Sequence, residues 1–219
     1  MSRVPTYAVI PTYQRWGWLY DCIGSLHNQV EHFIVLDNND VEMQPGEYLP
    51  KTTVVPYAKR PPNISEMWNI GIDFFSTVED TEWNILIVND DVVCPDNLVF
   101  TLETALRDSS AALAYPNQFT DEAILHTVAK PTPFEKKIAG FCFMLRGEQG
   151  LRLDESLVWW FGDDDLDWTC RQLGGSYMVP GCRVEHRDPD GNTKRNPLLT
   201  AQAVRDQARF KQKWGRIPV

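Results

Sequence analysis

The chain has 219 residues, of which 43% are hydrophobic and 23% are charged, so its length and composition are those of one globular domain and exclude a disordered or fibrous protein. Its formal net charge of −9 disfavours a general binder of nucleic acids or anionic membranes. The longest uncharged apolar run, Ile138 to Leu145, is too short to span a bilayer.

Short apolar runs alternate with helical patterns along the first half of the chain. We predict strands over 7–10, 32–36, 53–57, 84–88 and 111–115, and helices over 18–29, from Asn63 onward and over 96–107. A strand that returns after each helix indicates right-handed βαβ units and a mostly parallel sheet. In the second half we predict strands over 141–145 and 177–179 and helices over 165–173 and 199–214, while 116–137 is predicted as loop and short strands.

Three polar clusters follow the predicted strands: 11–15, 37–40 and 89–91. In parallel sheets, ligands bind beyond the carboxyl ends of the strands, so we expect these clusters on one rim. The last cluster, Asn89-Asp90-Asp91, follows a buried strand and offers the oxygen ligands that suit magnesium or manganese, particularly beside a diphosphate. The alternative is an acidic turn that caps the helix starting near Pro95.

A second acidic cluster places carboxylates at positions 163, 164, 165 and 167. Capping of a helix N-terminus explains one or two of them. Crowded carboxylates also raise one another's pKa, which is how a general base is tuned. His186 follows the strand predicted over 177–179 and is a candidate ligand beside the acidic metal site, the alternative being a structural or solvated histidine.

The five cysteines contain no Cys-x-x-Cys pair, so they predict neither a disulfide framework nor a zinc site. We expect buried, reduced thiols and a cytoplasmic protein, and the N-terminal residues carry no secretory pattern. The sequence also lacks a Walker loop, a G-x-G-x-x-G loop and a nucleophile motif, which discounts a P-loop NTPase, a dinucleotide dehydrogenase and a triad hydrolase.

These motifs, in this order, resemble the GT-A-fold glycosyltransferases and especially glycosyltransferase family 2. The segments 9–15 and 35–38 resemble that family's first two strands with their nucleotide-contacting ends, and Asn63 with Asn69 resembles its N-x-G helix, although Ser65 replaces a glycine. Asn89-Asp90-Asp91 stands where the family has its Asp-x-Asp metal motif, and 164–171 resembles its E-D-x-D-L-x-x-R motif with Asp in place of Glu.

The resemblance implies an α/β fold of the GT-A type, a three-layer sandwich with a mostly parallel central sheet and a C-terminal helix. It implies a single domain over 1–219, with a nucleotide-sugar half over 1–115, an acceptor and catalytic half over 116–190, and a basic C-terminal helix over 191–219. The implied activity is that of an inverting, metal-dependent hexosyltransferase that moves a sugar from a nucleotide diphosphate, a UDP-sugar by preference, to an acceptor hydroxyl.

The same resemblance implies roles for individual residues. Asp165 is the base, with Asp164 beside it as a second catalytic residue and Arg171 as an orienting partner. Asp91 and His186 hold Mn²⁺ or Mg²⁺. The donor-binding residues are Pro11, Thr12, Tyr13, Arg15, Asp37, Arg60, Asn63, Asn69 and Asp90. The acceptor-side residues are Gly140, Phe141 and Trp160.

Two other functions are open on the sequence: a sugar nucleotidyltransferase, and a nucleotide-sugar-binding module without catalysis. The acceptor is a protein, a glycan or a modified DNA base, as in an enzyme of a bacterium or bacteriophage. Arg205, Arg209, Lys213 and Arg216, at roughly helical spacing in the basic C-terminal stretch, are candidates for contact with a nucleic acid, the alternative being a solvated helix face.

Overall fold

The computed structural model describes residues 4–39, 49–77, 82–189 and 191–218. Its centre is an eight-stranded sheet in the order β3-β2-β1-β4-β8-β6-β9-β7, and a two-stranded sheet pairs β10 with β5. The strands are β1 (Thr6–Thr12), β2 (His32–Asp37), β3 (Thr52–Pro56), β4 (Asn84–Val88), β5 (Val92–Val93), β6 (Leu113–Pro116), β7 (Ile124–His126), β8 (Cys142–Arg146), β9 (Ser176–Val179) and β10 (Glu185–His186).

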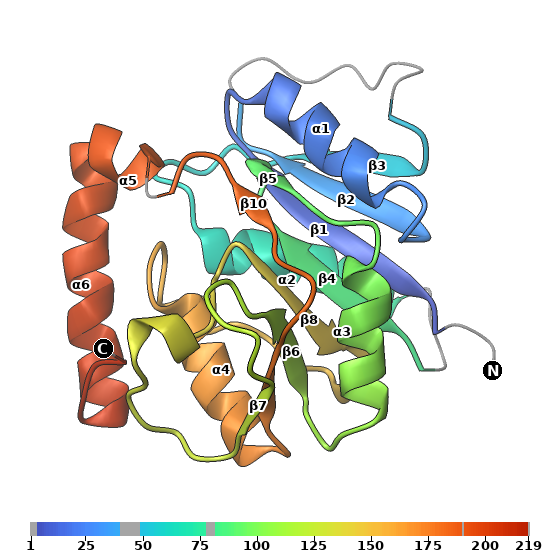
Figure 1. The fold of residues 1–219 in the computed structure, drawn as a ribbon. Coiled ribbons are helices and arrows are strands. Elements are labelled where there is room, and N and C mark those ends of the chain that lie inside the picture. Colours follow the sequence, from blue (N-terminus) through green and yellow to red (C-terminus); the bar gives the residue numbers. More distant parts are fainter. Residues whose placement is uncertain (1–3, 40–48, 78–81, 190, 219) are drawn as a thin grey trace.

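Helices flank this sheet (Figure 1). They are α1 (Trp16–Leu26), α2 (Ile64–Ser76), α3 (Leu98–Arg107), α4 (Gly162–Gln172), α5 (Gly191–Arg195) and α6 (Pro197–Trp214), with two short 3₁₀ helices, η1 (Phe134–Lys136) and η2 (Gly147–Gln149).

The alternation of side chains along the strands builds two apolar cores. Ala8 and Ile10 of β1 pack with the buried faces of α1 and α3, whereas Val9 packs with those of α2 and α4. Successive residues of a strand point to opposite faces, so a strand that is apolar throughout requires a cover on both sides. The three-layer α/β sandwich predicted from the sequence is therefore confirmed.

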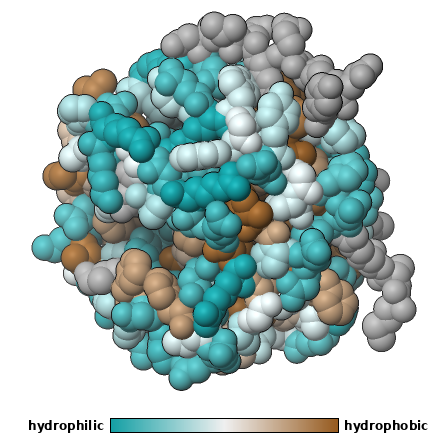
Figure 2. All heavy atoms as spheres, turned by 45° about the horizontal axis from the view of Figure 1, so that its top comes forward, coloured by the Kyte–Doolittle hydropathy of each residue, from teal (hydrophilic) through white to brown (hydrophobic). Residues whose placement is uncertain are grey.

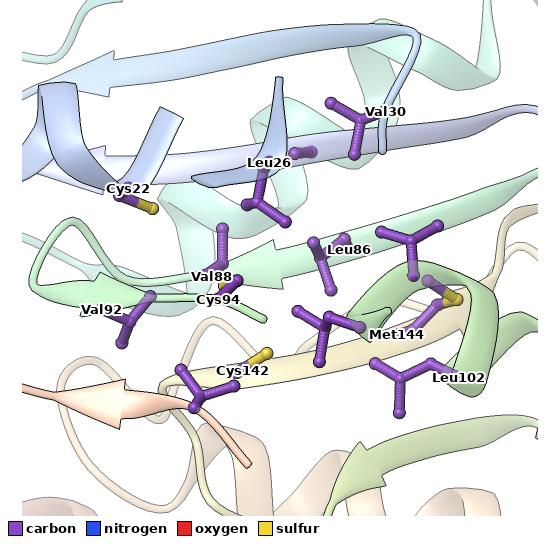
Figure 3. Close-up of a cluster of buried hydrophobic side chains, with 14 of the residues drawn as sticks. Cys22, Leu26, Val30, Leu86, Val88, Val92, Cys94, Leu102, Cys142 and Met144 are labelled. Atoms are coloured by element: carbon purple, nitrogen blue, oxygen red, sulfur yellow. The ribbon is translucent and has the colours of Figure 1, made fainter. Parts of the chain in front are cut away.

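Figure 3 shows part of the first core, where Cys22, Cys94 and Cys142 lie among Leu86 and Val88. All five cysteines of the chain are buried and free. Burial raises the pKa of the Cys170 and Cys182 thiols, which keeps them protonated and unreactive. The thiols act here as small apolar side chains.

The sheet is mostly parallel, as predicted, but β8 runs antiparallel between β4 and β6. Strand β7, at the edge of the sheet, also runs antiparallel to its neighbour β9. The pairing of β10 with β5 was not predicted, because two strands of two residues each leave no periodic signal in a sequence. Helix α4 also begins three residues earlier than predicted, at Gly162 instead of Asp165.

Helix α6 packs against α4 through a third, smaller apolar cluster that contains Trp168 and Phe210. Its N-terminus is capped by Asn196, whose side chain accepts a hydrogen bond from the Leu198 amide. Within the described residues, no helix has the length and apolarity that crossing a membrane requires. Figure 2 shows one face of the molecule, on which hydrophilic residues predominate and apolar ones form separate patches.

Candidate active site

A cleft of about 1880 Å³ lies where the chain leaves β1 and β4. The β1–α1 loop and the β4–β5 turn line one part of it, and the start of α4 with residues 137–141 lines another. Residues between 184 and 199 complete the wall. The polar clusters at 11–15 and 89–91 therefore meet at one rim, as the parallel connectivity predicts.

The β4–β5 turn presents Asp90 and Asp91 to the cleft. Asp90 accepts hydrogen bonds from the Thr12 hydroxyl at 2.8 Å and the Tyr13 amide at 3.4 Å, which join the ends of the neighbouring strands β1 and β4. Burial raises the pKa of Asp90 to about 7, against the opposing effect of the Thr12 hydrogen bond. Asp90 therefore couples the β1–α1 loop to the acidic turn.

His186 reaches this turn through the small second sheet. His186 pairs with Val92 in the β10–β5 ladder, and its Nε2 lies 3.3 Å from Asp91 Oδ1. The Phe141 ring packs on the imidazole with ring centroids 4.2 Å apart, and the Phe141 carbonyl accepts a hydrogen bond from the Asn89 amide. The two predicted metal ligands thus face each other although they are distant in sequence.

Asp91 and His186 fit a divalent cation that takes its remaining ligands from a substrate. Asp91 Oδ1 is buried without a hydrogen-bond partner, so an acceptor oxygen is available beside the imidazole. Two ligands at right angles on an ion about 2.1 Å from each are about 3 Å apart, close to the observed separation. Among the described residues no group of three His, Cys, Asp or Glu side chains converges on such a site, so the chain itself offers few ligands.

Arg15 already supplies a positive charge at this turn. Its guanidinium donates to Asp91 Oδ2 at 2.5 Å and to Asp188 Oδ2 at 2.6 Å, and it lies 3.8 Å from Asp90 Oδ1. The guanidinium also stacks over Trp18, with 5.0 Å between the guanidinium carbon and the ring centroid. A side chain from the β1–α1 loop therefore ties the acidic turn to the segment before α5.

Two carboxylates from the first turn of α4 line the other part of the cleft, Asp163 and Asp164. Asp164 pairs with Lys137 Nζ at 2.9 Å through Oδ2, while its Oδ1 is buried without a hydrogen-bond partner. Burial, helped by the charge of Asp163 and opposed by Lys137, raises the pKa of Asp164 to about 8. Gly140 passes so close to Asp163 that a Cβ at position 140 would displace the Asp163 carboxylate.

The structure places Asp165, the predicted base, outside this cleft lining. Its carboxylate accepts hydrogen bonds from Lys213 Nζ at 2.9 Å and from Trp214 Nε1 at 2.7 Å, both on α6. Arg171, its predicted orienting partner, instead forms a buried ion pair of 2.7 Å with Asp167. This geometry gives Asp165 and Arg171 structural contacts and does not support the roles expected for them.

The predicted donor-binding residues divide into two groups. Six of them line the cleft: Pro11, Thr12, Tyr13, Arg15, Arg60 and Asp90. The other three, Asp37, Asn63 and Asn69, do not. Asn63 caps α2 and donates to the Glu155 carbonyl, and Asn69 exchanges hydrogen bonds with the Leu153 backbone, so these two asparagines fasten α2 to the loop before α4. Their amides hold α2 in place, while Ile64, Met67 and Trp68 of the same helix line the cleft.

Asp37 ends β2 opposite Thr12 and accepts a hydrogen bond from the Asn39 amide, and the adjacent Asn38 lines the cleft. Asp40, the last residue of the predicted polar cluster, lies outside the described residues. The donor-binding role expected for Asp37 stays a prediction.

The predicted acceptor-side residues Gly140, Phe141 and Trp160 all line the cleft. The amides of Trp159 and Trp160 donate to Asp206 Oδ2 of α6 at 2.8 and 3.0 Å, and the Trp160 ring donates through Nε1 to Thr193 Oγ1 at 3.2 Å. The sequence reasoning did not identify Lys137, Phe119 and Phe134, which also line the cleft. The two phenylalanines are exposed and contact each other with ring centroids 5.4 Å apart. They come from the segment predicted only as loop, where no periodicity singles them out.

The four basic residues singled out in the C-terminal stretch have contacts within the chain. Lys213 pairs with Asp154 and Asp165, Arg209 donates to the Ser156 carbonyl, and Arg205 donates to the Gln202 side chain. Arg216 lies over the Trp168 ring. The contacts favour a packing role for this helix over the nucleic-acid contact considered from the sequence.

No known protein family and no curated protein matches this sequence. Solved structures do match its fold. TarS of S. aureus aligns with a TM-score of 0.59 and 9% identity in a structure of its residues 1–349, covering 93% of this chain and 68% of that one. A second structure of S. aureus TarS aligns with a TM-score of 0.61 and 10% identity, covering 93% of this chain and 42% of that one. GalNAc-T7, in a structure with UDP, GalNAc and Mn²⁺, aligns with a TM-score of 0.60 and 14% identity, covering 84% of this chain and 44% of that one.

These structures are GT-A glycosyltransferases, and the chain has the same fold. It spans less than half the length of GalNAc-T7 and of the longer TarS structure. Identities this low relate the architectures, so the resemblance seen in the motifs is confirmed at the level of the GT-A fold.

Proposed function

We propose that this chain is a glycosyltransferase that moves a sugar from a nucleotide diphosphate, with a UDP-sugar as the preferred donor, to an acceptor hydroxyl with inversion at the anomeric carbon. The observation that carries the proposal is the meeting in one cleft of Asp91 and His186 with the carboxylates of Asp163 and Asp164. One pair suits a cation and a diphosphate, and the other suits deprotonation of an alcohol. The structure of GalNAc-T7 with UDP and Mn²⁺, which shares the fold, agrees with this choice of donor and metal.

In this proposal the donor lies along the rim formed by the ends of β1 and β4. Tyr13 and Arg60 flank the space for the nucleoside, with the Arg60 guanidinium 5.9 Å from the Tyr13 ring centroid. Arg15 and the Asp91–His186 pair lie farther along the cleft, where a diphosphate follows. Asp91 and His186 would hold Mn²⁺ or Mg²⁺, which would supply positive charge to the departing diphosphate.

The chemical step assigns the base to Asp164 instead of Asp165. Asp164 Oδ1 is buried and lacks a partner, and because the pKa of this carboxyl is raised, its ionised form is a stronger base than an ordinary aspartate. It takes the proton of the acceptor hydroxyl while the hydroxyl oxygen forms a bond to the anomeric carbon. The bond from that carbon to the diphosphate oxygen breaks, and its electron pair leaves with the diphosphate. Attack opposite the leaving group inverts the configuration.

The acceptor enters from the side of Trp160, Phe119 and Phe134. These aromatic side chains are exposed and line the cleft beyond the carboxylates of α4. Aromatic faces accommodate the apolar faces of sugars and bases alike. A glycan or glycoside acceptor is the first choice, because exposed aromatic side chains line this side of the cleft.

The test is the release of UDP from several UDP-sugars in the presence of Mn²⁺. The acceptors are aryl glycosides, a serine- and threonine-containing peptide, and a DNA duplex with a hydroxymethylated base. Mass spectrometry then measures the mass added to each acceptor. UDP release with a sugar-sized mass gain on one acceptor supports the proposal. Pyrophosphate production indicates a nucleotidyltransferase, and tight binding of UDP-sugars without turnover of any acceptor indicates a binding module.

A further inference from the structure

The acidic turn after β4, together with Asp188, brings three carboxylates to one place, although only Asp91 among them is a proposed metal ligand. Asp90, Asp91 and Asp188 surround the guanidinium of Arg15, whose side chain is only 10% exposed. Buried carboxylates need a compensating cation, and in this structure Arg15 provides it for Asp90 and Asp91, while Asp188 also pairs with Arg195 at 3.0 Å. The same turn is the place where the proposed function puts a divalent cation.

The two oxygens of Asp91 are divided between these charges. Oδ2 accepts the hydrogen bond from Arg15 at 2.5 Å, whereas Oδ1 faces His186 at 3.3 Å and has no hydrogen-bond partner. A carboxylate whose charge is already neutralised by a guanidinium attracts a divalent cation less strongly, and two cations on one carboxylate repel each other. Arg15 therefore weakens the site that Asp91 and His186 offer to an ion.

A diphosphate changes this balance. Arg15 lines the cleft and carries the planar donor set that binds phosphate oxygens in pairs. The negative charge of a diphosphate both draws the guanidinium and supplies ligands to the ion. Each cation then has its own anionic partners, and the repulsion between the two cations is offset.

We propose that Arg15 is a resident counter-cation that competes with the divalent ion for Asp91 until a nucleotide diphosphate arrives. The ion and the nucleotide then bind cooperatively, and the ion binds weakly by itself. This inference rests on the proposed function for the identity of the ligands. By linkage, the factor by which the nucleotide raises the affinity for the ion equals the factor by which the ion raises the affinity for the nucleotide.

The experiment is calorimetric titration of MnCl₂ into the full chain, with and without saturating UDP. The variants are Arg15→Gln, Arg15→Lys and Arg187→Gln. Arg187 is a matched control because it lies next to His186 but pairs with Asp21 and Glu185 instead of the carboxylates around Arg15. Circular dichroism and thermal melting confirm that each variant is folded.

In the wild type we expect weak Mn²⁺ binding that UDP strengthens by roughly 5- to 150-fold, the usual range of coupling between sites. Without UDP, Arg15→Gln binds Mn²⁺ roughly tenfold more tightly than Arg187→Gln, and the effect of UDP on the ion shrinks. Arg15→Lys keeps the positive charge and stays close to the wild type in Mn²⁺ affinity without UDP.

Equal Mn²⁺ affinities of Arg15→Gln and Arg187→Gln without UDP overturn the inference, because Arg15 then does not compete with the ion for Asp91. Wild-type protein that binds neither UDP nor another nucleoside diphosphate overturns the proposed donor instead. The titrations of Mn²⁺ alone still decide the role of Arg15 in that case, so the two failures are distinguishable.

Discussion

The chain carries two acidic clusters, the turn at Asp90 and Asp91 and the first turns of α4, and they use their charges differently. In the turn, both carboxylates face the cleft and share Arg15. In α4, Asp164, Asp165 and Asp167 pair separately with Lys137, Lys213 and Arg171. A helix rotates about 100° per residue, which sends neighbouring side chains to different surroundings, whereas a tight turn can aim two of them at one site.

This difference separates the carboxylates available for chemistry from those that hold the fold together. Asp163 and Asp164 lie on the cleft side of α4, while Asp165 faces α6 and Asp167 faces the buried guanidinium of Arg171. The predictions below test this division, starting with the largest expected effect.

Replacing Asp91 with Asn removes the carboxylate that the proposed metal and Arg15 share. We expect transfer to fall by roughly 10⁴-fold, since a metal ion contributes several kcal/mol to stabilising the leaving group. The measurement is UDP release at saturating Mn²⁺. The matched variant Asp21→Asn removes an exposed partner of Arg187 outside the cleft and should retain activity. Comparable rates for both variants would argue against a metal-holding turn.

Replacing Asp164 with Asn tests the base within the second cluster. We expect a loss of about 10³-fold in kcat with little change in donor affinity, because general base catalysis typically contributes 10²- to 10⁴-fold. Asp163→Asn should lose less, since its carboxylate approaches Gly140 and only borders the reacting space. The reverse order, with Asp163→Asn nearly inactive, would transfer the role of base to Asp163.

The pH dependence of transfer follows from the same assignment. A base must be deprotonated to act, and burial raises the pKa of Asp164 to about 8. Transfer should therefore rise about tenfold per pH unit below that value and level off above it. Lys137→Met removes the charge that opposes this shift, so the rising limb should move to higher pH. Initial rates across pH 5.5 to 9.5 measure both; identical profiles for the wild type and Lys137→Met would contradict this pairing.

Replacing Asp165 with Asn should affect stability more than catalysis. The change weakens two hydrogen bonds to α6, from Lys213 and Trp214, and hydrogen bonds to charged groups contribute about 1.5–3 kcal/mol each when buried. Lys213 is partly exposed, so we expect a loss of about 1–2 kcal/mol in the free energy of unfolding. Urea denaturation measures it. A loss of transfer by orders of magnitude at unchanged stability would restore Asp165 as the base.

The sequence alone determined the layered architecture, because continuous apolar strands such as Asn84–Val88 require helices on both faces and strands separated by helices pair in parallel. It also determined that Asp90 and Asp91 follow a strand and reach the rim where Thr12 ends β1. These features depend on local periodicity and chain connectivity, both of which can be read directly from the amino-acid sequence.

Only the tertiary structure decided which acidic side chains share an environment. Helix α4 starts at Gly162, three residues before the predicted start, and α6 packs beside it. In this arrangement Asp165 points toward Lys213 of α6, while Asp164 lines the cleft. The placement of Arg15 between Asp91 and Asp188 likewise depends on contacts between distant segments. Such contacts follow from the packing of whole elements against one another, and a difference of one residue along a helix is enough to change the partner of a charge.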